Sequence, residues 1–188
     1  IIIFQTMMIT MAMRMGIGNS SHKKSRFQNP FKIVFGRAFA NVMIYTVFSI
    51  FFLGLLPLIF HLPHLGNYLH IAIMMIPYLF ASAFFCLTLV SFFTDGDMPL
   101  FIIVFMSVPL VFLTGISYPL ELMPWHWKIF HYTLPVAPAT LAFVKLDCMG
   151  GDLTNIRPEM INLWIQCLVY YVVAVIIWNR KDERKIVR

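Results

Sequence analysis

Hydrophobic residues occur along this chain in long blocks that are separated by short polar segments. A block of about 20 apolar residues is long enough to cross a bilayer as an α-helix. The blocks predict membrane spans over residues 38–60, 69–93, 99–116 and 158–178, and the apolar run over residues 1–16 is interpreted as the end of a further span. The pattern therefore predicts an all-α fold, a polytopic membrane helix bundle.

The first apolar run has no basic leader and no small-residue cleavage site, so it does not have the pattern of a signal peptide. It is also short for a complete span. We interpret it as the last part of a truncated helix, and we expect that an N-terminal part of the natural protein precedes residue 1.

Composition agrees with a membrane location. The chain of 188 residues is 60% hydrophobic and only 12% charged, whereas soluble domains are about 25% charged. The net charge of +6 does not indicate a nucleic-acid partner, because the basic residues gather in loops and in the tail, as membrane topology requires. The three cysteines form no CxxC pair, so neither a disulfide framework nor a zinc site is predicted.

Two segments are rich in basic residues. The loop over residues 17–37 carries five Lys or Arg residues and no acidic residue, and the tail over residues 179–188 carries five basic and two acidic residues. The positive-inside bias places both in the cytoplasm. Loop parity then puts residues 61–67 and 118–157 outside and residues 94–98 inside.

The basic loop contains a short amphipathic pattern. Over residues 25–35, aromatic residues recur at helical spacing beside basic ones, and Pro30 suits the first turn of a helix. Such a helix lies on the inner membrane surface. Two interpretations stay open, a surface anchor and a docking helix for a cytoplasmic partner.

The segment over residues 117–147, with Gly115 before it, is too apolar for a solvated loop and too rich in proline for one straight helix. We predict two short helices, from about Pro124 to Leu134 and from about Pro138 to Asp147, that enter the outer leaflet and return. Trp125, Trp127 and Tyr132 are expected at the level of the headgroups. The alternative is an ordinary extracellular loop with interfacial aromatics.

Catalytic chemistry is not indicated. No charged residue lies deep in a predicted span, which argues against an ion-coupled carrier. There is no nucleophile elbow, no HExxH and no phosphate-binding glycine loop, so no catalytic residue, metal site or ATP site is predicted. His61 and His64 have a spacing at which they could share a metal ion, but loop or interfacial histidine is the more ordinary interpretation.

The order Gly115, Tyr118-Pro119, Met123-Pro124 and Leu134-Pro135, followed by a helix that ends near Lys145, resembles the re-entrant segment of ABC-2 type transporter permeases. The resemblance covers nearly the whole chain. It implies that residues 1–188 are the C-terminal portion of such a transmembrane domain, in which the basic loop is the coupling element.

The resemblance also implies a function, the membrane subunit of an ATP-binding cassette exporter. Two copies, identical or different, would form the substrate path, and ATP and magnesium would be bound by a separate cytoplasmic ATPase, so that this chain is not itself an enzyme. A periplasmic adaptor protein is a further candidate partner beside membrane lipid, and the bacterial cytoplasmic (inner) membrane is the expected location. The alternative is a polytopic membrane protein without transport activity, either an assembly scaffold or an intramembrane enzyme.

The resemblance assigns two sets of residues. The ATPase-coupling residues are Lys23, Lys24, Arg26, Phe27, Phe31, Lys32 and Arg37. The outer gate is expected to contain Gly115, Tyr118, Pro119, Pro124, Trp125, Trp127, Pro135 and Pro138.

Overall fold

The computed structural model describes residues 1–21, 30–61, 65–92 and 98–186. Within these ranges every regular element is a helix, which confirms the predicted all-α class. The elements are α1 (Ile2–Ser21), α2 (Pro30–Ile50), a π-helical turn (Phe51–Leu55), α3 (Leu56–Ile59), α4 (Tyr68–Phe92), α5 (Met98–Leu113), a 3₁₀ turn (Leu120–Leu122), α6 (Trp125–Thr133), α7 (Val136–Asp147) and α8 (Arg157–Ile186).

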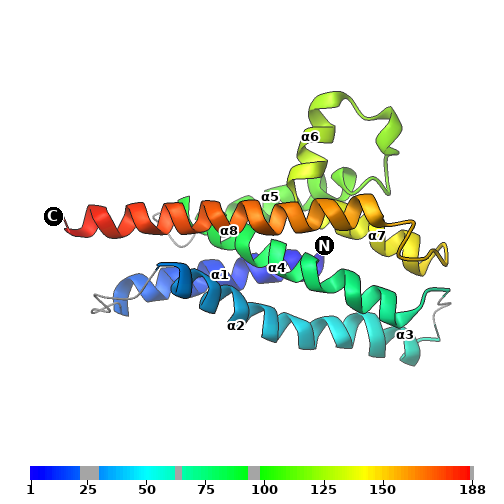
Figure 1. Ribbon diagram of the computed structural model, residues 1–188, viewed down its shortest axis with the longest axis horizontal. Coiled ribbons are helices and arrows are strands. Elements are labelled where there is room, and N and C mark those ends of the chain that lie inside the picture. Colours follow the sequence, from blue (N-terminus) through cyan, green and yellow to red (C-terminus); the bar gives the residue numbers. More distant parts are fainter. Residues whose placement is uncertain (22–29, 62–64, 93–97, 187–188) are drawn as a thin grey trace.

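The long helices lie side by side along one axis (Figure 1). The last turn of α1, the first turn of α2 and the ends of α4 and α8 lie at one end of the bundle, which we call the basic end. The short helix α3, the start of α4, the end of α7 and the start of α8 lie at the opposite end, which we call the hairpin end. The ends of these helices therefore alternate between the two ends of the bundle, and which end faces the cytoplasm stays a prediction.

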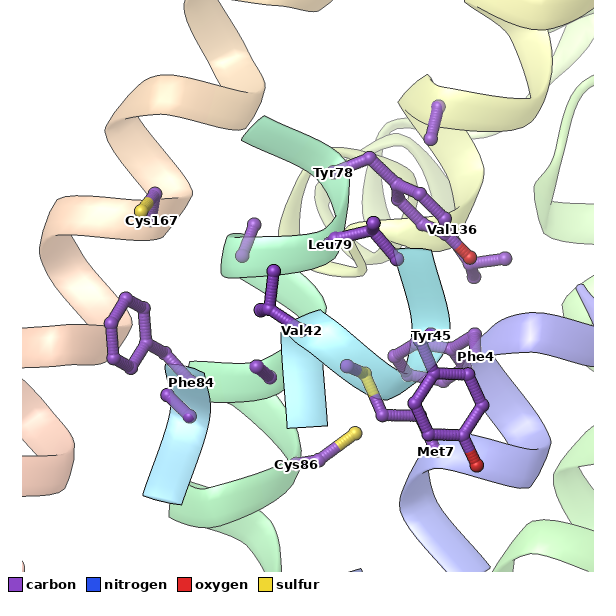
Figure 2. Close-up of a cluster of buried hydrophobic side chains, with 14 of the residues drawn as sticks. Phe4, Met7, Val42, Tyr45, Tyr78, Leu79, Phe84, Cys86, Val136 and Cys167 are labelled. Atoms are coloured by element: carbon purple, nitrogen blue, oxygen red, sulfur yellow. The ribbon is translucent and has the colours of Figure 1, made fainter. Parts of the chain in front are cut away.

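Helix α4 is the centre of the bundle. In the described residues, three helices are long and apolar enough to cross a membrane, namely Phe31–Ile59, Tyr68–Phe92 and Arg157–Asn179. The rest of the chain buries 78% of the apolar stretch of α4, against 22% of that in Phe31–Ile59 and 28% of that in Arg157–Asn179. Side chains of α1, α2, α7 and α8 converge on α4 in the buried cluster of Figure 2, which includes Tyr78, Phe84 and Cys86. The rest of the chain therefore leaves most of the surface of the two outer spans uncovered.

Small residues allow this close packing. Lipid is as apolar as leucine, so van der Waals contact rather than the hydrophobic effect holds helices together in a membrane. Helix α4 buries Ala81, Ser82 and Ala83 completely. Hydroxyl groups add hydrogen bonds between helices, because Thr10 Oγ1 lies 2.8 Å from the Tyr45 hydroxyl and Thr88 Oγ1 donates to the carbonyl of Tyr170 at 3.3 Å.

Helix α2 begins at Pro30, as the sequence predicts. It then continues without interruption into the span, so the amphipathic residues 30–35 form the first turns of a spanning helix instead of a separate surface helix. The span therefore starts earlier than residue 38. Near its other end the helix widens into the π-turn before Pro57, whose ring and missing N–H disturb the regular hydrogen bonds.

Helix α5 stands where the span over residues 99–116 is expected. It has 16 residues and ends at Leu113, which corresponds to about 24 Å at 1.5 Å per residue and falls short of the roughly 30 Å hydrocarbon core. That this segment crosses the membrane stays a prediction.

Candidate functional site

The proline-rich segment after α5 folds into a helical hairpin. Helices α6 (Trp125–Thr133) and α7 (Val136–Asp147) meet at 85°, which confirms that the segment is two short helices. Leu134, the residue between them, is extended with φ −86° and ψ 120°. The following Pro135 disfavours a helical conformation at that position, so the break is encoded locally. Pro138 falls in the first turn of α7, where no N–H is needed for the helix.

A compact loop connects α5 to α6. Gly115 adopts φ +82°, a conformation that side chains disfavour. Pro119 and Pro124 each stand immediately before a helical turn with extended ψ values of 135° and 148°. The Tyr118 hydroxyl donates to the carbonyl of Leu122 at 3.3 Å. The proline pattern therefore shapes two successive entries into helical structure.

Helix α6 and this loop project from the bundle beside α5 and α7 (Figure 1). Trp125 is 75% exposed, and Trp127, Phe130 and Tyr132 are also exposed. Exposed tryptophan and tyrosine on a helix are typical of a membrane interface. Their position at headgroup level stays a prediction.

A polar face of α8 completes the hairpin. It consists of Glu159, Asn162, Gln166 and Tyr170, which are spaced three or four residues apart and so share one side of the helix. Gln166 Nε2 donates to the carbonyl of Tyr132 at 2.6 Å, and Asn162 Nδ2 donates to the same oxygen at 3.4 Å. The Tyr170 hydroxyl donates to the carbonyl of Thr133 at 2.5 Å.

These bonds satisfy backbone carbonyls that the break between α6 and α7 would otherwise leave unpaired in an apolar environment. The last carbonyls of a helix have no partner within it, and irregular backbone at membrane depth is tolerated only where protein or water satisfies it. The polar face of α8 supplies that partner at the end of α6.

The far end of α7 is fixed by charge and by backbone bonds. Lys145 Nζ lies 2.6 Å from Glu159 Oε1, with side chains 32% and 9% exposed. Lys145 is in the last turn of α7 and Glu159 in the first turn of α8, so each charge also complements its own helix dipole. The backbone N–H groups of Leu65 and Gly151 donate to the carbonyls of Asp147 and Lys145.

His131 anchors the base of α6. It is 1% exposed, and its Nδ1 donates to the carbonyl of Leu113 at 2.6 Å. Burial lowers the pKa of His131 below its ordinary value, while the bond to Leu113 and the charge of Glu159 oppose that shift. The residue lies on the hairpin, outside the three spanning helices. A neutral imidazole therefore joins the end of α5 to the end of α6.

The predicted coupling residues that the structure describes lie at the basic end, on the first turns of α2. The Phe31 ring lies 6.5 Å from that of Tyr171, and the Arg37 guanidinium lies 4.5 Å above the Trp178 ring. Lys32 is exposed. The remaining four, Lys23, Lys24, Arg26 and Phe27, lie outside the described residues.

The sequence interpretation missed the polar face of α8 and the role of His131. A signal for the first was present, since polar residues at helical spacing in an apolar span indicate a buried polar contact. No signal distinguished His131 from His126, which is exposed. Across the described ranges no three His, Cys, Asp or Glu side chains come together in a way that could hold a metal ion.

The fold and the hairpin define a multi-pass helical membrane protein. The family model described as ABC-2 family transporter protein matches residues 1–176. The chain belongs to this family and is a transporter permease subunit. No curated protein and no solved structure matches the chain.

Proposed function

We propose that this chain is the membrane subunit of an ATP-driven exporter that works as a dimer with a separate cytoplasmic ATPase. The observation that carries the proposal is the position of α8. Near the basic end its Tyr171 and Trp178 contact the coupling residues Phe31 and Arg37. Towards the hairpin end its polar face holds α6 and α7.

Helix α8 has 30 residues, which gives it a length of about 45 Å. A stiff element of this length carries a displacement from one end to the other, as rigid-body mechanisms require. An ATPase that shifts the start of α2 would therefore tilt α8, and α8 would shift the hairpin that forms the outer gate.

The start of α2 has the character of a docking surface for such a partner. Phe31 is 57% exposed although it touches Tyr171, and Lys32 beside it is exposed. Large aromatic and basic residues commonly carry most of the energy of an interface. The basic residues of the preceding loop extend this surface in sequence.

The test is recovery of the ATPase with the permease from detergent. We expect Phe31→Ala with Lys32→Ala to weaken binding, since loss of one anchor costs about 2 kcal/mol, roughly thirtyfold in affinity. Phe48→Ala is the matched control, because Phe48 lies on the same helix, is 48% exposed, and is far from the basic end. Equal recovery of the ATPase with both variants would refute the docking role.

Orientation in the bacterial inner membrane has a separate test. Cys148 is exposed at the hairpin end, whereas Cys86 and Cys167 are buried. An impermeant thiol reagent should label natural Cys148 from the outside only, and a Ser25→Cys substitution in a Cys148→Ser chain should be labelled from the cytoplasm only. Labelling of both from one side would contradict the topology.

A further inference from the structure

Helix α7 packs one face into the bundle. Its residues Val136, Ala137, Ala139, Ala142 and Leu146 are at most 5% exposed. It packs against both α4 and α8. Gly66 lies so close that a Cβ there would stand 2.5 Å from the carbonyl oxygen of Leu146. Together with the ion pair and the backbone bonds at its end, these contacts fix α7 to the bundle.

Residues 116–133 have the opposite character. The only buried residue of α6 is His131. Polar contacts of the loop and the start of α6 are internal to the segment, since Tyr118 donates to the carbonyl of Leu122 and Lys128 to that of Glu121. Figure 1 shows the segment standing away from the bundle. It is therefore held by its base, where His131 bonds to Leu113 and the carbonyls of Tyr132 and Thr133 accept bonds from α8.

The two ends of residues 116–133 lie close together at the base of the segment. At one end Gly115 has φ +82°, and at the other Leu134 is the single extended residue between two helices. The bond from His131 to the carbonyl of Leu113 joins these two ends. Hinges are a few loop or terminal residues that absorb backbone rotation, and this pair has that form.

We propose that residues 116–133 form a flap that rotates as one body about Gly115 and Leu134 when the bonds at its base, from His131 to Leu113 and from α8 to Tyr132 and Thr133, are released, while α7 stays with the bundle. The outer gate is then this flap and not the whole hairpin. Its role as a gate rests on the proposed transport function, but the hinge itself does not.

Distances between spin labels test the flap in the permease alone, reconstituted in lipid nanodiscs. Three pairs of labels are used. Leu122→Cys with Ile129→Cys gives a distance within the flap. Ile129→Cys with Ile161→Cys gives the distance from the flap to α8, and natural Cys148 with Ile161→Cys gives the distance from α7 to α8. All four sites are exposed, and Cys148→Ser removes the native thiol from the first two pairs. Dilution with unlabelled protein removes distances between copies.

We expect His131→Ala, made in a Gln166→Leu, Tyr170→Phe chain that lacks the two short bonds from α8 to Tyr132 and Thr133, to broaden or shift the flap-to-α8 distance by about 5 Å, one helical turn, and to leave the other two distances unchanged. His131→Asn, whose amide nitrogen lies near the position of Nδ1, should restore the parent distribution. An unchanged flap-to-α8 distance would overturn the proposal. A change in the α7-to-α8 distance would also overturn it, because the hairpin would then move as a whole.

Failure of the transport function is a different result. It would appear as loss of ATPase recovery in every variant and would not alter the label distances.

Discussion

The ion pair between Lys145 and Glu159 offers the sharpest test of the hairpin geometry. Glu159 is 8% exposed, its Oε1 has Lys145 at 2.6 Å, and its Oε2 is buried without a hydrogen-bond partner. Lys145→Met removes the positive charge and keeps the length of the side chain. The carboxylate is then left buried and uncompensated.

The expected cost follows from this burial. Removing one partner of a buried pair costs about 3 to 5 kcal/mol, whereas exposed pairs contribute about 0 to 1 kcal/mol. Because Lys145 is one-third exposed and water reaches it, we expect about 3 kcal/mol for Lys145→Met. Glu159→Gln leaves only a partly hydrated ammonium group and should cost about 1 kcal/mol.

The assay is equilibrium unfolding in mixed detergent micelles for both single variants and the double variant. The double variant should have a free energy of unfolding close to that of Glu159→Gln. The coupling energy between the two residues is then about 3 kcal/mol, which is large for a contacting pair. Lys128→Met is the control, since Lys128 contacts only the carbonyl of Glu121 at 3.5 Å, and it should change stability by less than about 0.5 kcal/mol. If Lys145→Met costs no more than this control, the buried ion pair does not hold α7 to α8.

Three further substitutions test neighbouring contacts. Gly66→Ala should destabilise the fold by about 1 to 3 kcal/mol in the same unfolding assay, because its Cβ would stand 2.5 Å from a carbonyl oxygen of α7; Gly54→Ala, with no atom within 4 Å, should be tolerated. Gln166→Leu should cost about 1 to 3 kcal/mol, since it removes the shortest bond to the carbonyl of Tyr132; a cost below that of Gly54→Ala would contradict the capping role. Burial lowers the pKa of His131 in the folded protein below 6.5, so on acidification this imidazole is protonated at a higher pH in the unfolded protein than in the folded one. The contribution of His131 to the free energy of unfolding is therefore complete above pH 6.5 and falls as the pH drops. The acid loss in thermal stability should be smaller in His131→Asn, and an equal loss in both proteins would refute the assignment.

The hairpin could be predicted from the sequence because its structure is encoded locally. Pro135 disfavours a helical conformation at Leu134, so a break between two helices is predicted from the residues. The start of α2 at Pro30 has the same local origin. Its unbroken continuation into the span was not predicted, because basic residues near a helix end fit both a surface helix and the end of a span.

The arrangement of the spans could not be predicted in the same way. All three candidate spans are strongly apolar, yet α4 is mostly buried and the other two are mostly left uncovered by the rest of the chain. Lipid and protein interior favour the same apolar side chains, so hydrophobicity does not distinguish them. The buried small residues Ala81, Ser82 and Ala83 mark α4 as central only once its neighbours are known.

The same difference in burial decides which helix can carry motion between the two ends. Helix α4 is enclosed by α1, α2, α7 and α8, and displacement of a close-packed core helix requires all its neighbours to repack. Helix α8 buries little of its apolar stretch within the chain and meets its other helices mainly through α4, the start of α2 and the hairpin. Its contacts at Trp178 and Gln166 are specific, whereas the lipid around it offers no fixed packing. A tilt of α8 against a stationary α4 is therefore the motion that we propose to link the predicted coupling residues with the flap.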